Sequence, residues 1–72
     1  MLIYIGPRRR ALGMTQEELE ARIGVSRPAI ALWEAGTRKP GADKLPLLAA
    51  ALGCGVGELF RAPEQDSREE AG

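Results

Sequence analysis

Residues 15–36 read TQEELEARIGVSRPAIALWEAG, a pattern typical of two short helices joined by a tight turn. Thr15 is a preferred helix N-cap residue, and Glu18, three positions later, completes a capping box. Leu19 and Ile23 lie four positions apart, so both point to one face of the first helix. Gly24 tolerates the left-handed conformation with which helices commonly end. The pattern therefore predicts a helix that starts after Thr15 and stops at Gly24.

The second half of the stretch predicts another capped helix. Ser26 is an N-cap residue, and Pro28 falls in the first turn, where a missing N–H costs little. Ile30 and Trp33 are three positions apart and form the apolar face of this helix. Gly36 ends it. Two capped helices joined by a glycine turn indicate a helix-turn-helix motif.

The sequence resembles the Cro and phage-repressor class of helix-turn-helix domains, often called XRE-type. The matching segments are GMTQEEL at 13–19, IGVSR at 23–27, WEAG at 33–36, RKP at 38–40, LLAAALG at 47–53 and VGELF at 56–60. The resemblance implies an all-α fold, a five-helix bundle of the lambda-repressor type. It also implies that the protein binds double-stranded operator DNA as a homodimer and represses transcription.

The segment before the motif is the least regular part of the expected bundle. Gly6-Pro7 interrupts it, and the residue before a proline is disfavoured in helical angles. We therefore expect a short first helix from Pro7 to about Leu12, with Ile5 outside it. Residues 2–5 read LIYI, an apolar and largely β-prone run. We expect this run to be buried, either on the bundle or across a dimer interface.

The segment after the motif predicts two more helices and a tail. Helical spacing of leucines places the fourth helix from about Asp43 to Leu52, with Pro46 shortening or kinking its first turn. A brief fifth helix follows from Val56 to Phe60, with Gly55 at its N-cap. Residues 61–72 contain no large apolar residue and read as a disordered acidic tail. The predicted DNA-binding domain therefore spans residues 1–60.

The charge balance bears on nucleic-acid binding. Ten basic and ten acidic residues give a net charge of zero. Residues 1–40, however, hold seven Arg or Lys against four Glu, whereas residues 41–72 hold three basic residues against six acidic ones. The half that carries the motif is thus positive, as phosphate binding requires. A solvated surface of mixed charge is the alternative interpretation.

The composition argues against several other classes of protein. A single cysteine excludes an internal disulfide, and with no histidine present a zinc site is excluded in practice. We expect no metal, cofactor or small-molecule ligand, and no enzyme, because paired catalytic groups are missing. No secretory signal or apolar run of membrane length is visible, so we expect a cytoplasmic protein without a membrane partner.

The resemblance also implies which residues meet DNA. It places the first turns of the second motif helix in the major groove, with base contacts at Arg27, Pro28, Ala31 and Leu32. Arg27 is the one long polar side chain of this set and matches guanine O6 and N7, whereas the other three suit thymine methyl groups. Contacts to phosphates are expected at Gln16, Ser26, Thr37, Arg38 and Lys39. The alternative for these polar residues is a solvated surface that contacts nothing.

Five other residues have a structural interpretation. By resemblance, Arg9 and Glu34 form an ion pair. Glu20 stands where the family usually has alanine, so it must bend outward or find a cation, with Arg27 and Arg10 as candidates. Trp33 is expected in the core, because one aromatic residue without companions is a poor platform for stacking bases. Cys54 is expected to be a small buried residue.

Two alternative functions fit the same sequence. The first is the antitoxin of a toxin–antitoxin pair, in which the tail or the apolar N-terminus binds a toxin. The second is a protein-interaction module that no longer reads DNA, suggested by the apolar Pro28, Ala31 and Leu32 and by the zero net charge.

Overall fold

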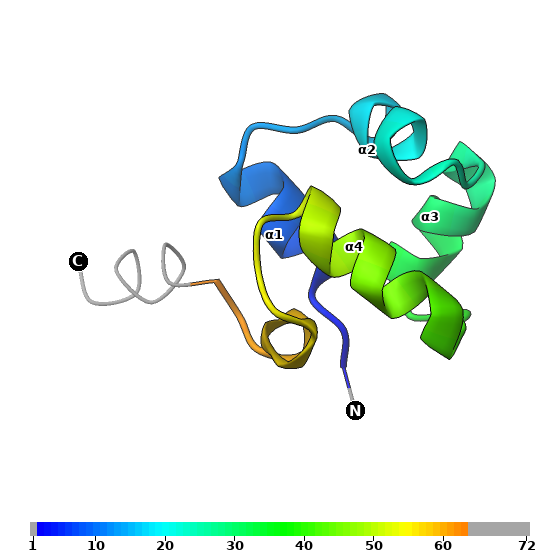
Figure 1. The fold of residues 1–72 in the computed structure, drawn as a ribbon. Coiled ribbons are helices and arrows are strands. Elements are labelled where there is room, and N and C mark those ends of the chain that lie inside the picture. The colour runs from blue at the N-terminus through cyan, green and yellow to red at the C-terminus, as the bar shows by residue number, and fades with distance from the viewer. Residues whose placement is uncertain (1, 64–72) are drawn as a thin grey trace.

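Helices account for all the regular structure in the computed structural model, which describes residues 2–63 (Figure 1). The four α-helices are α1 (Ile5–Ala11), α2 (Gln16–Ile23), α3 (Arg27–Ala35) and α4 (Leu45–Ala51). Two 3₁₀ segments complete the fold, η1 (Ala42–Lys44) before α4 and η2 (Val56–Phe60) after it. The expected bundle is confirmed, with its fifth helix in the 3₁₀ form. From residue 64 on, the predicted disordered tail lies outside the described residues.

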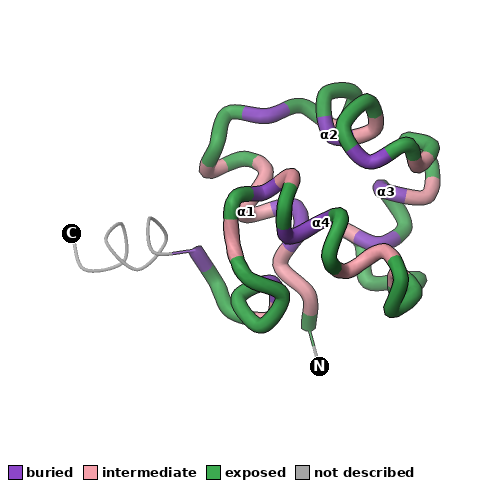
Figure 2. Tube along the Cα trace, viewed as in Figure 1, coloured by how far each residue is buried: buried purple, intermediate pink, exposed green. Residues whose placement is uncertain are grey.

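The core draws on every main helical element. Five side chains are completely buried, one each from α1, α2, α3, α4 and η2, and they are Ile5, Leu19, Ile30, Leu48 and Leu59. Met14, Ile23, Trp33, Ala49 and Leu52 surround them. In Figure 2 the buried stretches of these elements face one another across the interior. The apolar faces predicted for the two motif helices are therefore confirmed.

The helix-turn-helix forms as the sequence predicts. Thr15 Oγ1 accepts the N–H of Glu18 at 3.0 Å, and Glu18 Oε1 accepts the N–H of Thr15 at 2.8 Å, so the capping box is complete. Gly24 ends α2 with φ at 70°, and Gly36 ends α3 with φ at 80°. Glycine adopts this left-handed conformation without the steric penalty of a Cβ.

The first helix starts earlier than expected. Ile5 and Gly6 are helical, and the carbonyl of Tyr4 accepts the N–H of Arg8 at 3.2 Å. The clash that keeps a residue before proline out of the helix involves its Cβ, which Gly6 lacks. Pro7 falls in the first turn, where backbone N–H groups have no helical partner, so its missing donor is harmless. Complete burial of Ile5 then favours the two extra helical residues.

The N-terminal run packs on its own bundle, except for its first described residue. Ile5 is buried and Ile3 packs against the core, whereas Leu2 remains 69% exposed. The N–H of Tyr4 donates to the carbonyl of Leu59 at 2.7 Å, which places the run beside η2 (Figure 1). The expected burial on the bundle is thus confirmed for Ile5, while Ile3 and Tyr4 are half-buried and Leu2 is exposed in the single chain.

Arg8 joins α1 to η2 and the residue after it by hydrogen bonds. Its Nε donates to the carbonyl of Glu58 at 2.9 Å, and a terminal nitrogen donates to the carbonyl of Arg61 at 3.1 Å. At the start of η2, Glu58 Oε1 accepts the N–H of Gly55 at 2.7 Å, so Gly55 occupies the predicted N-cap position. These bonds stabilise a 3₁₀ segment of only five residues.

Pro46 shortens the fourth helix, as predicted. The 3₁₀ segment η1 leads directly into α4, which begins at Leu45, so Pro46 lies in the first turn of α4. Residues from Asp43 to Lys44 therefore belong to a 3₁₀ segment rather than to the α-helix. None of the helices within residues 2–63 has the length and apolar character needed to cross a membrane.

Candidate nucleic-acid interface

One side of α3 is exposed while the other is buried. Ile30 and Trp33 point into the core, whereas the four residues predicted to contact bases are all exposed, namely Arg27, Pro28, Ala31 and Leu32. Leu32, the largest apolar side chain of the four, is 37% exposed. The helical period therefore places the four on a solvent-facing surface of the helix, as contact with a groove requires.

Arg27, the first residue of α3, is held at two points by glutamates of α2. A terminal nitrogen of its guanidinium lies 3.2 Å from Glu17 Oε2, in an ion pair whose side chains are 53% and 73% exposed. Its backbone N–H donates to Glu20 Oε2, also at 3.2 Å. Both carboxylates come from one face of α2, because they are three positions apart on the helix.

This arrangement corrects the expectations for Ser26 and Glu20. Ser26 has the extended conformation of an N-cap, but its side chain makes no capping hydrogen bond. Glu20 takes over that role from the neighbouring helix. It neither bends away nor pairs with a cation side chain, because an N–H at the positive end of α3 satisfies its carboxylate.

Four of the five residues predicted to contact phosphates lie at the two ends of α3. Ser26 is exposed before α3, and the exposed loop after α3 carries Thr37, Arg38 and Lys39. The backbone N–H groups of Thr37 and Arg38 donate to the carbonyl of Leu32 at 3.0 and 3.3 Å, which folds this loop back onto the end of α3. The two cations are thus placed at the C-terminal end of the exposed helix.

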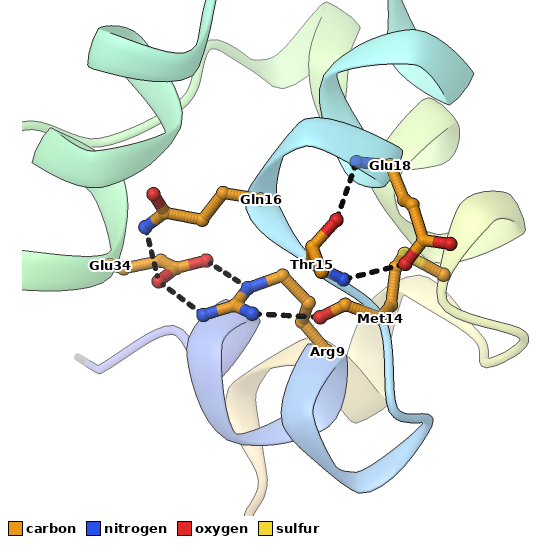
Figure 3. A network of polar contacts seen from close by, with 6 residues as sticks. All are labelled: Arg9, Met14, Thr15, Gln16, Glu18 and Glu34. Atoms are coloured by element: carbon orange, nitrogen blue, oxygen red, sulfur yellow. Dashed lines mark hydrogen bonds and ion pairs between the residues drawn. The ribbon is translucent and has the colours of Figure 1, made fainter.

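Gln16 differs from the other phosphate candidates, because its side chain is already bonded within the domain. It is half-buried, and its Nε2 donates to Glu34 Oε1 at 3.0 Å (Figure 3). An amide has two N–H donors, so one remains for a partner outside the domain. The bond fixes where that second donor points.

The predicted pair of Arg9 and Glu34 is confirmed and has bidentate geometry. Arg9 Nε lies 2.8 Å from Glu34 Oε2, and a terminal nitrogen of Arg9 donates to Oε1 at 3.1 Å. The other terminal nitrogen donates to the carbonyl of Met14 at 2.7 Å, and Figure 3 shows these bonds joining α1, α3 and the start of α2. Both side chains of the pair are only 11% exposed.

The same network sets the protonation of Glu34. Burial by itself raises the pKa of this carboxyl, but hydrogen bonds from Arg9 and Gln16 and the charges of Arg9 and Arg10 outweigh it, and the pKa lies below its ordinary value. Glu34 is therefore ionised at neutral pH. As a bonded, nearly buried carboxylate it belongs to the frame of the site and not to its outer surface.

The sequence did not lead us to predict that Arg10 lies on the exposed surface next to Arg27. Arg8 bonds to η2 and Arg9 to Glu34, so the third residue of the RRR run is the one left exposed. An open hollow of about 480 Å³ lies between Arg10, the start of α2 and Arg27. The signal was present in the sequence, since consecutive helical residues point in different directions.

The other titratable and metal-binding side chains of the described residues form no second candidate site. Within residues 2–63 no group of His, Cys, Asp or Glu has the arrangement of a metal site. Cys54 is half-buried against the core, and burial raises the pKa of its thiol, which therefore stays protonated at neutral pH.

The fold and this surface together define a helix-turn-helix domain. The sequence profile of the helix-turn-helix family matches residues 8–59. The chain therefore belongs to the helix-turn-helix family, in its XRE-type class, whose members bind DNA and regulate transcription. No curated protein sequence matches the chain.

Solved structures agree with this assignment. The solution structure of the DNA-binding domain of the P22 c2 repressor (1–76) is 34% identical, with a TM-score of 0.76, and the match covers 81% of this chain and 76% of that one. The P22 c2 repressor in complex with synthetic operator 9T is also 34% identical, with a TM-score of 0.74 and coverage of 82% and 89%. A hypothetical transcription factor from Neisseria shares the fold at 24% identity, with a TM-score of 0.74 and coverage of 92% and 76%.

Proposed function

We propose that the protein is a homodimeric transcriptional repressor that places α3 in the major groove of operator DNA. The observation that carries this proposal is the exposed surface of α3, which holds Arg27 together with Pro28, Ala31 and Leu32. Its opposite side is fixed in the core by Ile30 and Trp33, so the helix is presented rigidly. The P22 c2 repressor, which shares the fold, has been solved on a synthetic operator.

In the proposed complex the residues have different tasks. Arg27 bonds to a guanine edge, and the three apolar residues contact thymine methyl groups. Arg38 and Lys39 at the end of α3, with Thr37 and Ser26, bond to phosphates on either side of the groove. Gln16 offers its second amide N–H at the start of α2, where Arg10 adds positive charge.

The dimer is proposed to form at the end of the molecule away from α2. Leu2 is 69% exposed and Val56 is 39% exposed, and the N-terminal segment lies beside η2. In Figure 1 this end lies opposite α2. A domain of about 60 residues buries only roughly 60% of its unfolded surface, so further apolar burial between two copies stabilises it. Two copies would then present their α3 helices about 34 Å apart, one DNA turn.

The proposal is tested first by selecting binding sites from a random pool of duplex DNA. We expect an enriched site with two related halves whose centres are about one helical turn, or about 10 base pairs, apart. Arg27→Ala should then weaken binding to the selected site far more than to random duplex. Arg38→Ala should weaken both alike and flatten the salt dependence by about one unit of slope.

The outcomes separate the competing functions. Equal loss on both kinds of DNA in Arg27→Ala would show that Arg27 contacts phosphate, and base reading would be wrong. A pool that yields no enriched site would favour the protein-interaction module. For the dimer, Val56→Asp and Leu2→Asp should lower the sedimentation mass, whereas Leu12→Asp, also at an exposed leucine (54%), should not. An unchanged mass in the first two variants contradicts the proposed interface.

A further inference from the structure

Two carboxylates of α2 hold the residue that is proposed to read a base. Glu17 contacts the guanidinium of Arg27 at 3.2 Å, and Glu20 accepts its backbone N–H at 3.2 Å. One contact restrains the side chain and the other restrains the backbone at the first residue of α3. The side chain of Ser26, which at an N-cap position would accept an N–H from the second or third helical residue, makes no capping hydrogen bond.

We propose that Glu17 and Glu20 are positioning residues that set the specificity of Arg27 for guanine. This inference rests on the proposed function, because it concerns how that function's base contact is oriented. A free arginine side chain samples many rotamers and loses this freedom when it binds. A guanidinium already tethered at one terminal nitrogen loses less, and its other N–H groups remain for O6 and N7 of a base.

The negative charge of Glu17 has a second effect, on the affinity for DNA of any sequence. Glu17 lies in the first turn of α2, which in the proposed complex faces the DNA backbone. A carboxylate there repels phosphates on every sequence and weakens non-specific binding. Only a site with guanine in reach of Arg27 offsets that repulsion. The charge of Glu17 therefore lowers affinity for every duplex, and the ratio of specific to non-specific affinity is raised by its contact with Arg27.

Glu20 acts through the backbone instead of through charge at the DNA. Its oxygen lies at the N-terminus of α3, where free N–H groups attract an acceptor. Pro28 has no N–H, so the first turn of α3 has fewer donors than usual and the N–H of Arg27 is one of those left. Loss of the Glu20 contact should loosen the turn that carries both Arg27 and Pro28.

The test uses the duplex that the wild-type protein selects from a random pool, and the same duplex with 7-deazaguanine at the guanine whose identity depends on Arg27. The replacement puts a C–H in place of the N7 acceptor. Wild type should lose affinity by about tenfold, as expected for half of a good bidentate contact. Glu17→Gln should reduce this penalty to about two- to threefold while raising affinity for random duplex, because an exposed ion pair contributes at most about fivefold.

Glu18→Gln is the matched control, since it removes the same charge one residue away. The carboxylate of Glu18 bonds to the N–H of Thr15 and not to Arg27, and glutamine keeps an acceptor for that bond. It should raise random-duplex affinity as Glu17→Gln does, yet keep the tenfold penalty. Glu20→Gln should also keep the penalty, because it still accepts the N–H of Arg27, whereas Glu20→Ala should lower it at temperatures where the variant stays folded.

The results distinguish this inference from the proposed function. If Glu17→Gln and Glu18→Gln keep the same penalty, Glu17 does not position Arg27, and the inference is overturned while base reading stands. If Arg27→Ala keeps the wild-type penalty, Arg27 does not read the guanine, and both the inference and the base contact fail. A penalty that falls in Glu17→Gln and Glu20→Ala, and stays in their two controls, supports the inference.

Discussion

Replacing Glu34 with alanine should cost the domain about 3–5 kcal/mol of unfolding free energy, the usual cost of removing one partner of a buried ion pair. The carboxylate is 11% exposed and accepts three hydrogen bonds, two from Arg9 and one from Gln16. Without it, Arg9 keeps only the carbonyl of Met14 as a partner, and its guanidinium stays nearly buried without a counter-charge.

The size of this loss makes it easy to measure. In a domain of 60–100 residues, 1 kcal/mol shifts the midpoint of thermal unfolding by about 4–8 °C, so the variant should melt at least about 12 °C lower. Urea unfolding followed by far-ultraviolet circular dichroism at neutral pH gives the free energy directly. Protein concentration must be held fixed, because dimerisation stabilises the folded state.

Glu17→Ala provides the matched comparison, since its ion pair with Arg27 is 53% and 73% exposed and should contribute less than about 1 kcal/mol. An apolar double variant, Arg9→Met with Glu34→Leu, should recover much of the loss because no charge is left buried. If Glu34→Ala costs no more than Glu17→Ala, the pair is solvated in solution, and the reasoning from its burial is wrong.

Three further predictions concern stability. Folding lowers the pKa of Glu34, so the stabilisation that its carboxylate provides is present above the ordinary pKa of 4.5 and is lost as pH falls through the folded value. The difference in unfolding free energy between wild type and Glu34→Gln, measured by urea titration, should therefore narrow at pH values below 4.5. A difference that stays constant contradicts this prediction. Gly24→Ala should lower the unfolding free energy by about 1 kcal/mol, because the φ of 70° is unfavourable for alanine. No clash adds to this cost, since nothing lies within 4 Å of an added Cβ. An unchanged midpoint of thermal unfolding would argue against the left-handed conformation of Gly24. Ile5→Ala should lower the unfolding free energy of the monomer by about 2–5 kcal/mol, because Ile5 is completely buried. Leu2→Ala should lower it by less than about 0.5 kcal/mol, because Leu2 is 69% exposed. Equal losses of free energy in denaturant unfolding would refute the packing of the N-terminal run.

The helix-turn-helix was predictable because its signals are local. Thr15 with Glu18 and the left-handed Gly24 each act within one turn of helix, and the sequence states them directly. The burial of Ile30 and Trp33 follows from a period of 3.6 residues. The resemblance to known repressors supplied the ion pair of Arg9 with Glu34, which no local pattern indicates.

Other features depend on contacts between distant segments and could not be predicted in the same way. The early start of α1 depends on Ile5 meeting the core and on Gly6 lacking a Cβ before proline. Ser26 has the sequence of an N-cap, yet the capping oxygen comes from Glu20 on another helix. Gln16 was expected to be free for phosphate, and its bond to Glu34 becomes visible only when α2 and α3 are placed together.

The link between Tyr4 and Leu59 has a consequence for protein synthesis. The N–H of Tyr4 bonds to the carbonyl of Leu59, and Arg8 bonds to carbonyls of Glu58 and Arg61, so the first helix is completed by residues that the ribosome adds some fifty positions later. Helices α2, α3 and α4 and the Arg9–Glu34 pair of α1 with α3 lie before η2 in the chain, whereas the bonds of Tyr4 and Arg8 must wait for η2. A nascent chain stalled before η2 leaves the ribosome tunnel should therefore lack the bonds of Tyr4 and Arg8, and the joining of the N-terminal segment to η2 is a late step of translation.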